Sequence, residues 1–482
     1  MPTRAGDGVS TAPLRWGRAG LAVVDGWHMA SAPLVFAALA ASALSAALLS
    51  VAPPLGALPL AALAVILLAV SPLTRVVVVV FGGLLVFQSS QSLDSPKIAY
   101  LAAFSVAFAA ALPNFRRALY GCGQATRNIV TSALAFAAMI LLSLAVSLAH
   151  GDDLSLWVRG AAPYILFAAM PVFALDAALS VPRRMLTALL LLAGTVATAA
   201  YVVEWAARRR DLVQLALNHV ALPSTLLPAS LFALALAYAL RARRFRWLWA
   251  GVAGLVLLAM LLTGSRSNLA LLGALPFVYL SVGGGPMSRT ARFVAVAVVV
   301  LALAAAGLTV VQNSPGFAGG VLADRLSSVV TILSNPTADA SFRDRAAETA
   351  AALRDWSASP FLGTGPAHLV VWSTPGGGGA GLNIDSPVMY PMQFGLLGVA
   401  VLGGVALSWL GFIRRTSASV ARATLAGAWG VAFAWSAIGS PLDDKGFTMA
   451  LLLGLAISLA SDTSIAAGPP TPIHAWYRGP ST

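Results

Sequence analysis

Long apolar segments separated by short polar ones run along most of the chain. Each is about 15 to 22 residues long, which is the length that an α-helix needs to cross the hydrocarbon core of a membrane. A spanning helix also satisfies its own backbone hydrogen bonds, so the pattern predicts an all-α, polytopic membrane protein of about fourteen transmembrane helices with both termini on one side. The predicted spans are residues 33–52, 55–71, 76–91, 98–112, 129–149, 160–175, 185–203, 220–240, 247–262, 269–282, 293–312, 389–412, 425–439 and 447–460.

The segment 313–388 is the one long stretch that this pattern leaves outside the membrane. It divides the chain into a helix bundle at 1–312, a loop at 313–388, and further helices with a short tail at 389–482. Loops longer than about 15 residues are usually functional or disordered, so the working surface of the protein is expected here.

A helix and two glycine-rich turns are predicted within this loop. Ser341 followed by Asp344 is typical of a helix N-cap with an acid in the first turn, and the helix should end near Ser359. Residues 363–366, Gly-Thr-Gly-Pro, predict a tight turn, and the glycines at 376–379 predict a flexible run that serves as a hinge or lid. The helix is predicted to be amphipathic and to lie on the membrane surface or over the bundle, with an apolar face of Phe342, Ala346, Ala350, Leu353 and Trp356.

The composition is typical of an integral membrane protein. Hydrophobic residues make up 59% of the 482 residues and only 10% are charged, whereas soluble proteins are about one quarter charged. The first apolar segment, at 33–52, is too long for a cleaved signal peptide and lacks a small-residue cleavage site, so we expect a retained span. We therefore expect a multi-pass protein of a bacterial cytoplasmic membrane.

Basic residues set the expected orientation, because Lys and Arg are enriched in cytoplasmic loops. If both termini are cytoplasmic, 19 basic and 4 acidic residues lie inside, including Arg75 and Asp176, while 11 basic and 13 acidic residues lie outside. The net charges are then +15 inside and −2 outside, which sum to the formal charge of +13. The loop at 313–388 therefore should face the periplasm or the exterior.

Several classes of function are disfavoured. Of the 30 basic residues, 28 are arginines scattered between apolar segments, which is not the pattern of a nucleic-acid-binding surface. Cys122 is the only cysteine, and no His-Glu-x-x-His pattern or histidine cluster occurs. We therefore predict no metal and no cofactor.

A site on the outer face has no access to cytosolic ATP or nucleotide sugars. Group transfer there needs a donor that has crossed the membrane with its activating bond, and a glycan on a polyprenyl diphosphate is the usual one. Its chemistry requires cations to neutralise the leaving diphosphate, a base for the acceptor hydroxyl, and a groove between helices for the lipid tail.

Arginines on the predicted outer face are the candidate cations. Arg266 lies in a polar hinge between two apolar spans, where an unpaired charge is costly, and Arg343 and Arg345 open the loop helix. Each also has a plainer interpretation, as a snorkelling side chain or a solvated ion pair. Arg159 lies just before a predicted span and Arg210 ends a run of three arginines; for both, contact with anionic lipid headgroups is the simpler explanation.

Three places offer a candidate base. Asp385 lies just before the span that follows the loop, His368 follows the glycine turn, and Asn218 and His219 begin another helix on the outer side. A lone His or Asp in a loop is more often a helix cap or a solvated residue, so the sequence leaves the choice of base open.

The order of these elements resembles that of the O-antigen ligase and polymerase superfamily of bacterial envelope glycosyltransferases. The resemblance covers residues 208–404. Its four elements are Arg210 followed by Asn218 and His219; Thr-Gly-Ser-Arg at 263–266; Arg345 with Trp356, Pro360 and the Gly-x-Gly turn at 363–365; and Asp385-Ser386 followed by Tyr390 and Phe-Gly-Leu-Leu-Gly at 394–398.

The resemblance implies an inverting, metal-independent transfer of a glycan from undecaprenyl diphosphate to an acceptor sugar, within a GT-C-like fold. It implies that Arg266 and Arg345 stabilise the diphosphate, with Arg210 as a third cation. Asp385 departs from the family pattern, but a carboxylate can still accept the hydroxyl proton, so Asp385 is the expected base. Arg343, Asn218, His219, Arg159 and His368 remain candidates for binding the substrate. The implied partners are the lipid-linked donor, the acceptor glycan and membrane lipid, with a chain-length regulator and a flippase as further candidates.

Three functions remain open. Typical ligases have His-Asn where this chain has Asp385-Ser386, which favours a polymerase of polysaccharide repeat units over a ligase that attaches finished chains. A transporter of lipid-linked oligosaccharide or of a small solute is the alternative from another class. Transporters usually place ionisable residues near the middle of the membrane, whereas the candidate residues here gather at its predicted outer edge.

Overall fold

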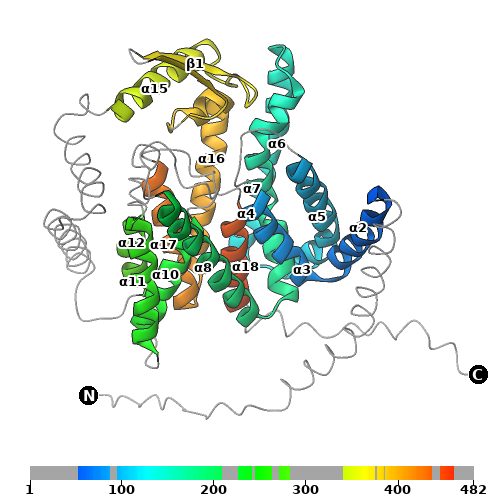
Figure 1. The fold of residues 1–482 in the computed structure, drawn as a ribbon, viewed down its shortest axis with the longest axis vertical. Helices are drawn as coiled ribbons and strands as arrows, with labels where there is room; N and C mark the ends of the chain where they lie inside the picture. The colour runs from blue at the N-terminus through cyan, green and yellow to red at the C-terminus, as the bar shows by residue number, and fades with distance from the viewer. Residues whose placement is uncertain are drawn as a thin grey trace, which may run out of the picture. The chain divides into compact units, whose positions relative to one another are not determined.

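The computed structural model describes residues 53–86, 95–208, 226–241, 245–262, 271–282, 340–374, 377–384, 386–436 and 446–460 (Figure 1). The chain divides into two units, 1–70 and 71–482, and the first unit contributes one described helix, α2 (Pro53–Val70). The described elements of the second unit are α3 (Pro72–Val77), the π-helix η1 (Val78–Gly82), α4 (Gly83–Val86), α5 (Ser95–Gly121), α6 (Gln124–Ala149), α7 (Leu154–Ser180), α8 (Arg183–Arg208), α10 (Leu226–Arg241), α11 (Arg246–Leu262), α12 (Ala274–Val282), α15 (Ala340–Ala358), β1 (Val370–Thr374), β2 (Gly377–Gly381), α16 (Met389–Arg415), α17 (Ser419–Ser436) and α18 (Phe447–Ala460).

Five described helices are long and apolar enough to cross a membrane, namely α5, α6, α7, α16 and most of α8. Helix α6 shows a lipid-facing stripe, because Leu134, Leu141 and Leu148 lie seven residues apart and are 63%, 65% and 55% exposed. Ile129 and Phe136, on its other side, are buried. A stripe of exposed leucines is unfavourable in water and stable in lipid. The chain is therefore a multi-pass α-helical membrane protein.

The predicted spans at 33–52 and 293–312 lie outside the described residues, so the number of fourteen stays a prediction. The other predicted spans fall at least partly on described helices, and α18 has the predicted bounds. Several helices are longer than predicted, and α5 and α7 exceed their predicted lengths most. Helix α5 continues through Pro113 to Gly121, and α7 continues beyond Leu175 to Ser180.

Helix α7 is central to the packing of the described helices. It contacts α3, α5, α6 and α18, and every residue from Met170 to Ala177 is buried. Helix α18 is buried on all sides from Phe447 to Ile457, as expected for a helix that is apolar all round. Because α18 also contacts α8, α10 and α17, it joins α7 to a second group of helices.

A charged pair is buried between α3 and α7. Arg75 donates to Asp176 from Nε at 2.7 Å and from Nη2 at 2.8 Å, and the side chains are 2% and 0% exposed. The Asn114 amide of α5 also donates to Asp176, at 2.8 Å. Paired, fork-shaped hydrogen bonds are the strongest that a carboxylate forms. The pair therefore ties α3, α5 and α7 together.

The positions of these two charges differ from the sequence-based expectation. We expected Arg75 and Asp176 in cytoplasmic loops, but both lie within helices and neutralise each other. The pattern of apolar segments did not predict that these charges are buried within helices, because each charge lies at the edge of an apolar segment. Since one residue is basic and the other acidic, the expected net charge of the cytoplasmic side does not change.

The loop helix and the turn between α6 and α7 lie at the same end of the bundle. Gly365 packs against the side chain of Ser147 near the end of α6, and Gly160 near the start of α7 packs against the carbonyl group of Pro366. We call this end, with the turn at 150–153 and the described residues of the segment 359–388, the loop end. The predicted orientation also places the turn and the loop on one side; which side faces outward stays a prediction.

Single cysteines can test this orientation in a Cys122→Ser background. Ser155→Cys and Ser373→Cys lie at exposed positions of the loop end, whereas Gly123→Cys lies in the exposed turn between α5 and α6 at the opposite end. We expect a membrane-impermeant maleimide to label the first two in intact spheroplasts, and the third only after the membrane is opened. Labelling of Gly123→Cys alone in intact spheroplasts would show the reverse orientation.

Removal of one partner of the buried charged pair tests its contribution to stability. Asp176→Ala leaves the Arg75 guanidinium buried without its carboxylate, so the free energy of unfolding in detergent micelles should fall by about 3 to 5 kcal/mol. The control is the double variant Arg75→Met, Asp176→Leu, which removes both charges and should recover much of that loss. A double variant as unstable as the single one would contradict this explanation.

Candidate functional site at the loop end

Helix α16 is broken close to its start, and a segment of the loop completes its hydrogen bonds. Gly395 has φ 63° and ψ −168° inside the helix. We call residues 360–365, which lie along this break, the strap. Four backbone hydrogen bonds join the strap to α16: Leu396 N to Pro360 O at 2.9 Å, Leu397 N to Phe361 O at 3.2 Å, Thr364 N to Met392 O at 2.8 Å, and Gly365 N to Gln393 O at 3.0 Å.

Three glycines make this close contact possible. Gly363, Gly365 and Gly395 have φ values of +73°, +88° and +63°, in the left-handed region that favours glycine. A Cβ atom on Gly395 would overlap the carbonyl group of Phe361, and one on Gly363 would lie 2.5 Å from the carbonyl carbon of Gln393. The tight turn predicted at 363–366 is displaced: Gly363 N donates to Ser359 O and His368 N to Gly365 O, so the turns lie at 359–363 and 365–368. Residues 363–365 between them run along the break in α16.

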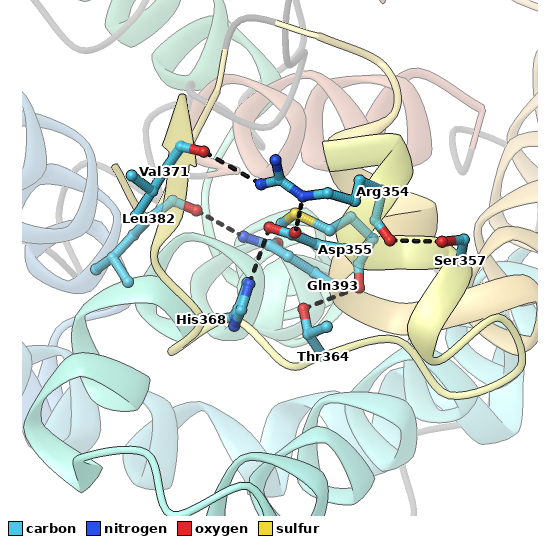
Figure 2. A network of polar contacts seen from close by, with 9 residues as sticks. Arg354, Asp355, Ser357, Thr364, His368, Val371, Leu382 and Gln393 are labelled. Atoms are coloured by element: carbon cyan, nitrogen blue, oxygen red, sulfur yellow. Dashed lines mark hydrogen bonds and ion pairs between the residues drawn. The ribbon is translucent and has the colours of Figure 1, made fainter. Parts of the chain in front are cut away.

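A buried polar network extends from this break into the bundle. Tyr164 of α7 donates from its hydroxyl to Gln393 Oε1 at 2.6 Å. Gln393 Nε2 donates to the carbonyl oxygen of Leu382 at 3.0 Å (Figure 2). Gln393 is 0% exposed, and the Tyr164 ring packs edge-on against Phe394. The network therefore joins α7, α16 and the segment after β2.

Helix α15 is present as predicted, but it turns a different face toward the protein. Ala352 is fully buried, and Arg345, Thr349 and Asp355 are partly buried on the same side. The face is set by polar contacts to the rest of the loop end, which a search for apolar periodicity does not detect. Three members of the predicted apolar face are exposed, namely Ala346, Ala350 and Leu353. This face therefore does not pack on the described helices, and its contact with the membrane surface stays a prediction.

The described part of the glycine run that we predicted to be flexible, residues 377–379, lies in a β-strand. Strand β2 pairs with β1 in an antiparallel hairpin, in which Trp372 lies opposite Gly379. The Trp372 side chain covers this strand, since a Cβ atom on Gly379 would lie 2.6 Å from the indole ring. An aromatic side chain that covers a glycine stabilises a strand that glycine alone would weaken. The prediction was wrong because this cover comes from the other strand.

Arg345 lies one helical turn from a contact between α15 and the start of α16. Thr349 follows Arg345 on the same face of the helix, and its hydroxyl donates to Ser386 Oγ at 3.0 Å. Ser386 is 2% exposed and also accepts a hydrogen bond from the backbone N–H of Val388 at 3.3 Å. The contact therefore brings the cation-bearing face of α15 to the segment that precedes α16.

A second polar cluster lies near the C-terminal end of α15. His368 Nε2 lies 3.1 Å from Asp355 Oδ2, and Arg354 Nε donates to Asp355 Oδ1 at 3.2 Å (Figure 2). Arg354 Nη2 also donates to the carbonyl oxygen of Val371 in β1, at 3.3 Å. His368 is held in the turn after the strap, where its backbone N–H donates to Gly365 O. The cluster links α15, this turn and the hairpin.

The start of α7 lies beside the same turn. Asp153 caps the helix, and the hydrogen bond from the backbone N–H of Ser155 lowers the pKa of the Asp153 carboxyl. Arg159, which we expected just before a span, lies in the second turn of α7 and is partly buried. Its neighbour Gly160 packs against Pro366, so Arg159 belongs to the loop end.

The structure gathers only some of the predicted site residues. Arg345, His368 and Arg159 lie at the loop end, and Arg343 is exposed on the first turns of α15. Among the described residues, no group of three or more His, Cys, Asp and Glu could hold a metal ion. The remaining predicted site residues lie outside the described part of the chain: Asp385, Arg266, Arg210, Asn218 and His219.

Sequence reasoning missed several residues of the site. Thr349 and Asp355 lie with Arg345 in a polar stripe at helical spacing. The sequence contains this signal, but only the periodicity of apolar residues was used to predict the faces of the helix. Gln393 and Tyr164 carry no such signal, because their contact depends on how α7 and α16 pack. Neither the models of known protein families nor the curated proteins compared with the chain gave a match.

A glycine substitution at the break of α16 tests the role of the strap. Gly395→Ala should lower the free energy of unfolding by about 1 to 3 kcal/mol from backbone strain alone, and the overlap with Phe361 adds to this. We expect the segment 359–388 to exchange its amide hydrogens faster in this variant, as measured by mass spectrometry.

The matched control is Gly403→Ala in the same helix. A Cβ atom there meets no other atom within 4 Å, and alanine is the better helix former by about 1 kcal/mol. This variant should be as stable as the wild type or more so. Equal effects of the two substitutions would show that the strap does not depend on Gly395.

Proposed function

We propose that the protein is a membrane glycosyltransferase of the O-antigen polymerase type. It transfers a glycan from an undecaprenyl diphosphate donor to a hydroxyl group of an acceptor sugar. The loop end is the site of the reaction and faces away from the cytoplasm. The reaction is inverting and uses no metal ion.

The main support is that the helix carrying Arg345 meets the segment that contains Asp385. Thr349 lies one turn from Arg345 and donates to Ser386 at 3.0 Å, and Ser386 directly follows Asp385 in the sequence. A diphosphate-binding cation and a proton-accepting carboxylate therefore belong to two segments that are in contact. This is the combination that the proposed reaction requires.

The proposed step forms one bond and breaks another. The acceptor hydroxyl oxygen bonds to the anomeric carbon of the donor glycan, on the side opposite to the diphosphate. The bond between that carbon and the phosphate oxygen breaks, and undecaprenyl diphosphate leaves with the electron pair. Asp385 accepts the hydroxyl proton, while Arg345 and Arg266 stabilise the negative charge that develops on the diphosphate.

An apolar surface beside the strap is suited to the lipid part of the donor. Phe361 is 72% exposed, and its carbonyl group bonds to Leu397 of α16. Leu396 and Leu397 are themselves 46% and 45% exposed on this spanning helix. Apolar side chains of the strap and of the membrane span are therefore adjacent, where a polyprenyl chain in the membrane could contact both.

Two features of the described helices bear on the transporter alternative. The buried Arg75–Asp176 pair lies near the end of α7, and the break at Gly395 lies near the start of α16, whereas transporters usually place such features near the middle of the membrane. The charged pair is fully engaged in fork-shaped hydrogen bonds. These observations favour catalysis at one end of the bundle over transport through it.

Alanine and amide substitutions test the catalytic proposal in purified protein with lipid-linked repeat-unit oligosaccharides. Arg345→Ala should lower the rate of polymer formation about 100-fold or more, because a preorganised cation for the leaving group is lost. Asp385→Asn should lower it about 100- to 10,000-fold by removing the base. Arg266→Ala should have an effect similar to that of Arg345→Ala.

The matched control is Arg117→Ala, an exposed arginine of α5 at the opposite end of the bundle, which should keep the wild-type rate. Full activity of correctly inserted Arg345→Ala and Asp385→Asn variants would refute the proposal.

A deletion strain separates the two glycosyltransferase functions, because a lost polymerase leaves single repeat units on lipid and a lost ligase leaves long unattached polymer.

A further inference from the structure

We propose that Arg354, Asp355 and His368 form a sugar-binding subsite that holds the acceptor glycan through its hydroxyl groups. The subsite rests on the proposed glycosyl transfer and adds a specific role for these three residues. His368 is one of several candidates that the sequence offers, whereas Arg354 and Asp355 become candidates only through their contacts in the structure.

The cluster is accessible to solvent, and its residues are held by α15, by the turn that contains His368 and by strand β1. The side chains of His368 and Arg354 are 32% and 67% exposed, while Asp355 between them is 15% exposed. Arg354 is fixed by its bonds to Asp355 and to the carbonyl oxygen of Val371, at 3.2 and 3.3 Å. Figure 2 shows Arg354 and His368 flanking the Asp355 carboxylate. A ligand can therefore reach both flanking groups without displacing the carboxylate.

The carboxylate determines which hydrogen bonds a ligand can form. With Asp355 beside Nε2, the neutral imidazole of His368 carries its proton on Nε2 and a lone pair on Nδ1. Nδ1 then accepts a hydrogen bond, and the unused N–H groups of Arg354 donate. A sugar ring offers hydroxyl groups that both donate and accept. One sugar hydroxyl can therefore donate to His368 Nδ1 on one side of Asp355, and another can accept from the Arg354 N–H groups on the other side.

The distance from Arg345 assigns this cluster to binding and not to catalysis. Asp355 lies ten residues after Arg345 on α15, which corresponds to about 15 Å along the helix axis. One anomeric carbon cannot contact groups so far apart at the same time. The cluster should therefore bind a sugar unit remote from the one that reacts.

The decisive variant is His368→Gln, because glutamine places an amide N–H near the position of Nε2 and no acceptor at the position of Nδ1. The acceptor probe is the repeat-unit oligosaccharide released from the producing bacterium's lipid-linked pool, at a fixed concentration of donor. We expect the KM for this acceptor to rise about three- to tenfold, the value of one lost hydrogen bond, while kcat changes less than about twofold. His368→Ala and Arg354→Ala should also raise this KM.

The control is Ser357→Ala on the same turn of α15. The Ser357 hydroxyl donates only to the carbonyl oxygen of Arg354, at 2.6 Å, so this variant should keep the wild-type KM. If His368→Gln has a wild-type KM and only His368→Ala is impaired, the pair is structural and the subsite is refuted.

Direct binding of the released oligosaccharide, measured by calorimetry, separates the two proposals. If the wild type transfers no glycan but binds the probe, and His368→Gln weakens that binding three- to tenfold, the subsite stands and the proposed function fails. If the wild type transfers glycan and His368→Gln binds the probe as the wild type does, the proposed function stands and the subsite fails.

Discussion

The hydrogen bonds between the strap and the break in α16 are the interactions on which the loop end depends. An unpaired backbone group inside a membrane costs several kcal/mol, so α16 can be broken at Gly395 only because residues 360–365 supply the missing partners. Helix α15 ends just before the strap, and the turn with His368 follows it. The backbone bonds therefore also fix where the side chains of α15 and of this turn can meet.

The sequence could predict features that depend on local pattern and failed on those that depend on a distant partner. Uniform apolarity determines the bounds of α18. The glycines near 363–366 indicate a bend in the chain, but the turns lie at 359–363 and 365–368. The strand at Gly377–Gly381 requires Trp372 to cover it, and the exposed side of α15 follows from the Thr349–Ser386 and Asp355–His368 contacts. The break at Gly395 has no local signal, because its partner groups lie in the strap.

Helix α15 gives the proposed site a fixed internal spacing. Arg345 and Asp355 lie on one rigid element, so the distance between the two polar clusters cannot adapt to the substrate as a flexible loop could. If the proposed assignments hold, the helix sets how far along the glycan chain the second contact falls. Selectivity for one repeat unit would then depend on the geometry of the helix as much as on individual hydrogen bonds.

The buried Arg75–Asp176 pair has a consequence for biogenesis. Its members are 101 residues apart in the chain, so Arg75 leaves the ribosome well before its carboxylate partner exists. A guanidinium buried among helices without its carboxylate is costly, so the packing of α3 against the bundle is complete only after α7 has been synthesised and inserted. The order of translation and the assembly of these helices in the bilayer are thus coupled through a single ion pair.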